Sequence, residues 1–166
     1  DNFTTNFMTL LNRLPIFPLY YEGKTKFAPI HCSDLTDVIF KVISNNVNSK
    51  IIECVGPEII SFKEILEKLL NLIGKKRLLI PMPLLMAQMS ARFFEIMPKP
   101  LLTRDQLKLL KYDNVLSGKY KSNSDIGVPS LRYFDEEVKK YCYMWREGGQ
   151  FSTEKYNSDN IDIKTN

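Results

Sequence analysis

The chain has 166 residues, 44 % of them hydrophobic and 25 % charged, which is enough to bury the core of one domain or slightly more. This composition excludes a disordered or collagen-like chain, and no stretch reaches the roughly 20 apolar residues that a membrane span needs. The net charge of +4 is too small to indicate a nucleic-acid partner.

The beginning of the chain has a helical pattern that ends at Pro15. The apolar positions that define this pattern are Phe3, Phe7, Leu10, Leu11 and Leu14. Because no initiating Met and no signal peptide precede it, we expect a piece of a longer protein. Glu22-Gly23-Lys24 predicts a turn, and residues 26–32 predict a strand.

Ser33 and Asp34 are the expected N-caps of a second helix. We expect its apolar stripe to be buried, and the stripe consists of Leu35, Val38, Ile39, Val42 and Ile43. A short apolar strand follows over residues 50–55 and ends at Gly56-Pro57. Strand, helix and strand over residues 26–55 would form a parallel crossover unit, unless the two strands belong to different sheets.

Ser61-x-x-Glu64 is a capping box, with Ile60 placed to pack on Ile65, and Gly74 is the expected end of this third helix. A third strand is predicted over residues 78–80. The basic cluster Lys75-Lys76-Arg77 before it is interpreted as a solvated turn, because no aromatic residues alternate with it to stack on bases.

Residues 84–97, from Leu84 to Met97, are almost entirely apolar. They predict either a buried helix or an amphipathic helix that contacts a membrane surface or a partner protein. Thr103-x-x-Gln106 is a second capping box, and residues 115–120 predict a loop. A last helix is expected over residues 131–145, with five inward residues: Leu131, Phe134, Val138, Tyr141 and Trp145.

The residues with catalytic potential are few. His31 is the only histidine, and a nucleophilic Cys32 would need this base within hydrogen-bonding reach. Because neighbouring residues of a strand point to opposite faces, we expect a structural histidine at a strand end. Three separated cysteines without C-x-x-C spacing argue against a disulfide framework or a zinc site and indicate a reducing compartment.

Two motifs of nucleotide-dependent enzymes can be judged by their spacing. Tyr20-x-x-x-Lys24 has the spacing of a redox Tyr–Lys pair, but Pro18 and Gly23 argue against the helix that such a pair requires. Neither Gly-x-Gly-x-x-Gly nor Gly-x-x-x-x-Gly-Lys occurs, so the sequence contains no phosphate-binding loop.

Four strings, in chain order, resemble one family. Asp1-Asn2-Phe3 resembles the end of a Gly-Pro-Glu-Asp-Asn-Phe motif, and residues 27–39 resemble the strand-to-helix motif of extended short-chain dehydrogenase/reductase proteins. Residues 56–66 are similar to the segment after the last Rossmann strand of that family. Residues 102–115 resemble the atypical branch that contains the nucleotide-binding accessory subunit of respiratory complex I and its bacterial relatives.

The resemblance implies an α/β, helix-rich chain that is the C-terminal part of a Rossmann-type fold of the NAD-dependent epimerase/dehydratase kind. Residues 1–146 would form a substrate- and partner-side domain, with the last Rossmann strand near residues 50–55, and residues 147–166 a disordered polar tail. NADP or NAD would be bound mainly by an N-terminal Rossmann half that is absent from this sequence. Residues 26–32 and 78–80 would then be strands of the small domain, which replaces the crossover interpretation.

The resemblance carries over no catalytic residue and no metal ligand. Phe3, Phe27, Pro29 and His31 match positions near the cleft between the two halves of such proteins. Arg104 matches a string that is specific to the complex I branch and is a further candidate for the cleft. The implied partners are the N-terminal half and, through residues 84–97, respiratory complex I or a membrane surface. A nucleic-acid partner is not implied. The implied location is the cytoplasm or the matrix side, peripheral to the inner membrane.

Three functions stay open at this point. The first is an accessory or structural role in a NAD(P)-binding protein associated with complex I. The second is the substrate lobe of an active nucleotide-sugar epimerase or dehydratase. The third is a stand-alone helical interaction module; a fragment of a larger sheet should instead expose Ile51, Ile52 and Val55.

Overall fold

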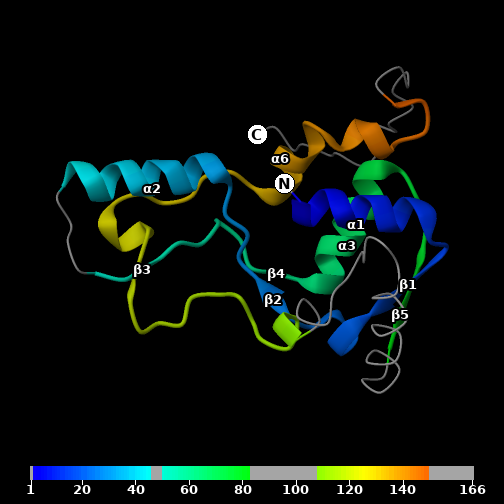
Figure 1. Ribbon diagram of the computed structural model, residues 1–166, viewed down its shortest axis with the longest axis horizontal. Coiled ribbons are helices and arrows are strands. Elements are labelled where there is room, and N and C mark those ends of the chain that lie inside the picture. The colour runs from blue at the N-terminus through cyan, green and yellow to red at the C-terminus, as the bar shows by residue number, and fades with distance from the viewer. Residues whose placement is uncertain (1, 46–49, 83–107, 150–166) are drawn as a thin grey trace, which may run out of the picture.

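The structure is a computed structural model, and it describes residues 2–45, 50–82 and 108–149. In these ranges the chain is mixed α/β, with four α-helices and six short strands that pair into three two-stranded sheets (Figure 1). The predicted helix over residues 84–97, the second capping box with Arg104, and the tail from residue 150 lie outside the described residues.

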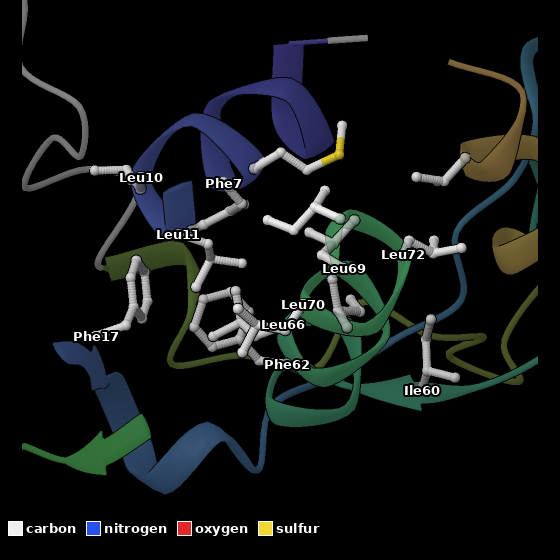
Figure 2. Close-up of a cluster of buried hydrophobic side chains, with 14 of the residues drawn as sticks. Phe7, Leu10, Leu11, Phe17, Ile60, Phe62, Leu66, Leu69, Leu70 and Leu72 are labelled. Carbon is white, nitrogen blue, oxygen red and sulfur yellow. The ribbon is translucent and has the colours of Figure 1, made fainter. Parts of the chain in front are cut away.

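Helices α1 (Asn2–Arg13) and α3 (Phe62–Ile73) build the hydrophobic core. Figure 2 shows Phe7 and Leu11 of α1 directed toward Phe62 and Leu66 of α3. The rings of Phe7 and Phe62 meet edge to face, with centroids 5.3 Å apart, and Leu11 and Leu66 are fully buried. The helical pattern predicted for the start of the chain is confirmed, although Phe3 itself stays exposed.

The predicted ends of α3 are confirmed in detail. Ser61 Oγ accepts a hydrogen bond from Glu64 N at 3.2 Å, and Ser61 N donates to Glu64 Oε2 at 2.6 Å, which completes the capping box. Gly74 ends the helix in the left-handed conformation, with φ of 66°. Arg146 adds a tertiary cap, because its Nε donates to Leu72 O at 2.7 Å.

Strand β1 (Ile16–Leu19) was not predicted, because Pro15 and Pro18 argue against regular structure at this point of the sequence. It pairs in parallel with β5 (Leu78–Pro81), the strand that was predicted. A two-stranded sheet has only edge strands, so a proline is tolerated in it. The basic residue before β5, Arg77, is not simply solvated, since its Nε and Nη2 donate to Leu11 O and Asn12 O at the end of α1.

The other two sheets correct the predicted strands. β2 (Lys26–Phe27) is much shorter than residues 26–32 and pairs antiparallel with β4 (Ile60–Ser61). β3 (Ile52–Glu53) pairs in parallel with β6 (Lys121–Ser122), so β2 and β3 form no crossover unit. Next to β3, Ile51 is 61 % exposed, whereas Ile52 and Val55 are half-buried.

Helix α2 (Cys32–Ser44) forms where predicted, but its apolar stripe is not buried. Only Val38 of this stripe is buried, while Leu35, Ile39 and Ile43 are 37 %, 51 % and 72 % exposed. Figure 1 shows α2 to one side of the core formed by α1 and α3. The described part of the chain therefore leaves most of this apolar face uncovered.

The predicted last helix is divided in two. α6 (Phe134–Lys139) is followed by the 3-10 helix η3 (Cys142–Trp145), because Tyr141 leaves the helical conformation at φ −130°. Phe134 and Val138 are buried as expected, whereas Leu131 is 73 % exposed. Tyr141 and Trp145 pack on the core and also reach α1, where Tyr141 Oη lies 2.7 Å from Thr4 Oγ1 and Trp145 Nε1 donates to Thr9 Oγ1 at 3.0 Å.

The remaining connections include two further 3-10 helices, η1 (Tyr20–Gly23) and η2 (Ser124–Ile126). Residues 115–120 form neither helix nor strand, as predicted. None of the described helices has the length and hydropathy to cross a membrane.

Candidate functional site

A cavity of about 710 Å³ opens between the start of α1, the segment that follows β2, the start of α2, and α6. Four of the five predicted cleft residues, Phe3, Phe27, Pro29 and His31, line this cavity together. Arg104, the fifth, lies outside the described residues. We refer to this cavity as the cleft; its other main lining residues are Thr4, Ile30, Cys32, Leu35, Cys54, Val55, Ile65, Asn114, Arg132, Tyr133, Phe134, Glu137, Val138 and Tyr141.

The cleft wall is largely apolar and continuous with the core. The Phe3 ring lies 6.1 Å from that of Phe27, and Phe27 lies 6.4 Å from Phe62 in the core, measured between centroids. Ile65 and Val138, which also line the cleft, are buried. The cleft is therefore a preformed surface of the folded body and not a gap between loosely placed segments.

His31 is the N-cap of α2, so the prediction of Ser33 and Asp34 as the caps is wrong. Nδ1 of His31 accepts a hydrogen bond from Ser33 N at 3.2 Å. An acceptor Nδ1 carries no proton, so the neutral ring holds its proton on Nε2. Nε2 lies 3.6 Å from Glu137 Oε2 and 3.9 Å from Cys32 Sγ.

The expectation that His31 and Cys32 point apart is also wrong. The chain leaves β2 after Phe27, and Cys32 is the first residue of α2, so the alternation of a strand does not apply. The two side chains nevertheless do not form a base and nucleophile pair in this arrangement, because Nε2 is the protonated nitrogen of the ring. The structural role expected for His31 takes the form of a helix cap.

Asp34 connects α2 to the segment before α6. Its buried carboxylate accepts hydrogen bonds from Leu131 N at 3.3 Å and Arg132 N at 3.2 Å, and it forms an ion pair with the Arg132 guanidinium. Asp37 Oδ2 lies 3.9 Å from the same guanidinium. The positive charge of Arg132 is therefore neutralised within the wall of the cleft.

Helix α6 is held against α3 by a second charged group. Glu58 Oε1 accepts a hydrogen bond from Phe134 N at 2.9 Å, and Lys68 Nζ donates to Asp135 Oδ2 at 2.5 Å. Burial acts to lower the pKa of Lys68, but its hydrogen bond to Asp135 and the charges of Asp135 and Glu58 hold that pKa above its ordinary value. The pair fixes the side of the cleft that Glu137 and Tyr141 belong to.

Glu137 is the acidic residue of the cleft. A 2.6 Å hydrogen bond from Lys140 Nζ holds the pKa of its carboxyl below the ordinary value, and the charges of Lys140 and Arg132 act in the same direction. Glu137 is therefore an ionised carboxylate with a cation already beside it.

The close approach of Gly56 to Pro29 was not anticipated. Gly56 N donates to Ala28 O at 3.1 Å, and a Cβ on Gly56 would lie 1.8 Å from Pro29 O. The sequence pattern indicates Gly56 only as the end of a strand. The contact fixes the cleft segment 28–31 against the chain that follows β3.

A buried network around Asn123 was also missed. Asn123 Oδ1 accepts from Val55 N at 3.1 Å, and its Nδ2 donates to Val128 O and Ser130 Oγ, both at 3.1 Å. Ser130 Oγ in turn donates to Val55 O at 2.7 Å. Asn123 belongs to no periodic sequence pattern. The sequence shows only that it is a polar residue in a predicted loop region, which does not predict that it is buried.

The three cysteines are free. Cys32 is exposed, Cys54 is half-buried in the cleft wall, and Cys142 is buried. Burial raises the pKa of the Cys54 thiol. Among the described residues, no group of three His, Cys, Asp or Glu side chains is placed to hold a metal ion.

Tyr20 and Lys24 do not share a regular helix, as expected from Pro18 and Gly23. Tyr21 and Glu22 between them take left-handed conformations, with φ of 50° and 58°, and Lys24 pairs with Glu22. The geometry required of a redox Tyr–Lys pair is therefore not present at these residues.

The fold and the cleft define a mixed α/β body with a mainly apolar cavity at the start of α2. No family model matches this chain, and no curated protein does so.

Proposed function

We propose that this chain is the C-terminal, substrate- and partner-facing half of a NAD(P)-binding protein of the short-chain dehydrogenase type. It contributes one wall of the cofactor and substrate cleft, and the dinucleotide is bound mainly by an N-terminal Rossmann half. Its role in the complex I-associated branch is accessory or structural. The proposal starts from the four strings that resemble this family in chain order.

One observation carries the proposal: all four of these strings meet at the cleft. Phe3 comes from the first string, Phe27 to His31 from the second, Ile65 from the third and Asn114 from the fourth, and all of them line the same cavity. The matching segments are separated by many residues in the sequence. Their convergence on one cavity is what a shared functional origin predicts.

The uncovered faces of the fold support a missing half. Helix α2 exposes Leu35, Ile39 and Ile43, and a monomeric domain rarely leaves such an apolar face open. β3 pairs only with β6 among the described strands, so its other edge is available to a larger sheet. Helix α2 lies largely within the strand-to-helix motif of the resemblance, and β3 lies within residues 50–55, which the resemblance implies to be the last Rossmann strand.

The character of the cleft favours this role over the substrate lobe of a nucleotide-sugar enzyme. A nucleotide diphosphate requires basic groups that are free to meet its phosphates. Among the described residues of the cleft, the only guanidinium is that of Arg132, which Asp34 already neutralises. If the chain were the substrate lobe of a nucleotide-sugar enzyme, the N-terminal half would therefore have to bind the phosphates of the substrate alone.

Docking on respiratory complex I or a membrane surface through residues 84–97 is part of the same proposal. These residues lie outside the described part of the chain, so the support for docking is their apolar sequence alone.

The test is a fluorescence titration of the full-length gene product with NADH and NADPH. We expect a saturable change of nicotinamide fluorescence and a rise of melting temperature with ligand, because binding to the folded state stabilises it. The 166-residue chain alone serves as the control and should give neither effect. A folded full-length protein that binds neither dinucleotide contradicts the proposal.

A further inference from the structure

The size and lining of the cleft define what it accepts. Its volume of about 710 Å³ lies within the range of small-molecule sites, roughly 300 to 1,000 Å³. Aromatic and aliphatic side chains form most of its wall, including Phe3, Phe27, Leu35 and Phe134. The transfer of an apolar ligand from water to this wall is therefore favourable.

The charges that face the cleft are already compensated. Arg132 is paired with Asp34, and Glu137 is paired with Lys140. The other described residues of the lining carry no formal charge apart from His31 when it is protonated. A charged ligand would thus lose its hydration in this cleft without gaining a counter-ion, which disfavours its binding.

His31 supplies a polar donor to the lining of this cleft. Capping of α2 uses Nδ1 of His31 and leaves the proton on Nε2, as described above. The nearest carboxylate oxygen, Glu137 Oε2, is 3.6 Å away, which is longer than an N–H···O hydrogen bond, and Cys32 Sγ at 3.9 Å is a weak acceptor. A ligand oxygen would be a better acceptor than either group.

We infer that the cleft binds an uncharged, mainly apolar ligand whose single carbonyl or ether oxygen accepts a hydrogen bond from His31 Nε2. This inference rests on the proposed function, because it names the ligand class of the same cleft. It excludes sugar nucleotides and free carboxylates as ligands of this half.

The experiment is isothermal titration of the full-length gene product with 2-decanone and with decanoate, in the absence of dinucleotide. These probes share a chain length and differ in charge. We expect saturable binding of 2-decanone and binding of decanoate that is at least about tenfold weaker, the ratio that a difference of roughly 1.4 kcal/mol gives. Equal or tighter binding of decanoate, or no binding of 2-decanone by folded protein, overturns the inference.

Two variants localise the site. His31→Asn keeps an N-cap acceptor, because Asn is among the best N-cap residues, but removes the Nε2 donor. It should weaken 2-decanone binding roughly fivefold, as expected for the loss of one hydrogen bond, with little change in melting temperature. Leu35→Trp fills the cleft from the half-exposed start of α2 and should abolish binding, whereas Thr36→Ala, on the exposed side of the same helix, should not affect it.

The results separate the two proposals. If His31→Asn leaves the binding of 2-decanone unchanged, His31 does not make the proposed hydrogen bond. If Leu35→Trp leaves it unchanged, the ligand does not bind in the cleft. Either result overturns the inference. A protein that binds NADPH but not 2-decanone contradicts this inference alone. A protein that binds 2-decanone but no dinucleotide contradicts the proposed function instead.

Discussion

Single residues at the cleft determine how its wall is held. Gly56 brings the chain after β3 against Pro29, and His31 begins α2 while it faces the cavity. Gly56 meets atoms that are distant in the sequence, and His31 lies beside Glu137 of α6. Substitutions at such positions should therefore act through backbone placement and not through general loss of apolar surface.

Gly56→Ala should destabilise the fold clearly more than Gly118→Ala does, by up to about 3 kcal/mol, because the added methyl group meets the Pro29 carbonyl and the backbone has to move. Gly118→Ala is the matched control. Gly118 has open space around its Cβ position and a left-handed φ of 73°, so alanine there costs only the conformational term of about 1 kcal/mol. Urea unfolding measures both, and an equal loss in the two variants would refute the close contact.

The three thiols should react in the order of their exposure. Cys32 should react first with a disulfide reagent, and Cys54 more slowly, because burial raises its pKa and lowers its thiolate fraction. Cys142, which has no exposed surface, should react only on unfolding. The measurement is thiol titration in native buffer and in denaturant, with Cys32→Ser and Cys54→Ser to assign the phases. Fast reaction of Cys142 in native protein would contradict the placement of η3.

At the scale of elements, a helix whose ends are determined by neighbouring residues could be predicted from the sequence. An element that depends on a distant pairing partner could not. The capping box at Ser61 and the glycine stop at Gly74 need only neighbouring residues, and both are confirmed. β1 was missed because its partner β5 lies more than fifty residues away, and no local pattern distinguishes its prolines from helix terminators. The cap of α2 was misassigned because Ser33 and Asp34 are commoner caps than His31.

Removal of the capping box should weaken α3 in a pH-dependent way. Ser61→Ala should cost about 1 kcal/mol at neutral pH. The hydrogen bond from the Ser61 backbone lowers the pKa of Glu64 from its ordinary value of 4.5, followed by the bond from the Ser61 side chain. The stability that Glu64 adds is therefore fully present above pH 4.5 and is lost as the pH falls through the lowered folded pKa.

Urea unfolding of Glu64→Gln against wild type at neutral pH and well below pH 4.5 checks this sign. The difference between the two proteins should shrink in acid. Glu67→Gln, on the exposed side of the same helix, is the control, and its effect should stay small at both pH values because it makes only an exposed ion pair with Lys63. A difference for Glu64→Gln that grows in acid would contradict the assigned role.

At the scale of the whole molecule, α2 and β3 are the parts that the described chain leaves incomplete. The apolar stripe of α2 was predicted to be buried, and the prediction fails within this chain because no described element covers Ile39 or Ile43. The cleft shows the opposite case. The resemblance implies Phe3, Phe27, Pro29 and His31 as cleft residues, and they lie together. Arg132, Glu137 and Tyr141 also line the cleft, but they come from α6 and from the residues on either side of it, which sequence spacing does not relate to the other four.

Ile39→Glu should leave the melting temperature of the 166-residue chain almost unchanged, since exposed substitutions alter stability by about 0.5 kcal/mol or less. It should reduce self-association of that chain, because it interrupts the apolar face of α2. Thr36→Glu, on the same helix, is the control for added charge. Sedimentation and thermal melting measure the two effects, and loss of folding in Ile39→Glu would contradict the exposure of this face.

The central claim is that a second, N-terminal body covers α2 and continues the sheet at β3. Hydrogen–deuterium exchange of Cys32–Ser44 and Ile52–Glu53, compared between the 166-residue chain and the full-length gene product, measures this coverage directly. The account predicts that these amides exchange markedly more slowly in the full-length protein, while those of α3 change little. Identical exchange of α2 and β3 in the two proteins would contradict it.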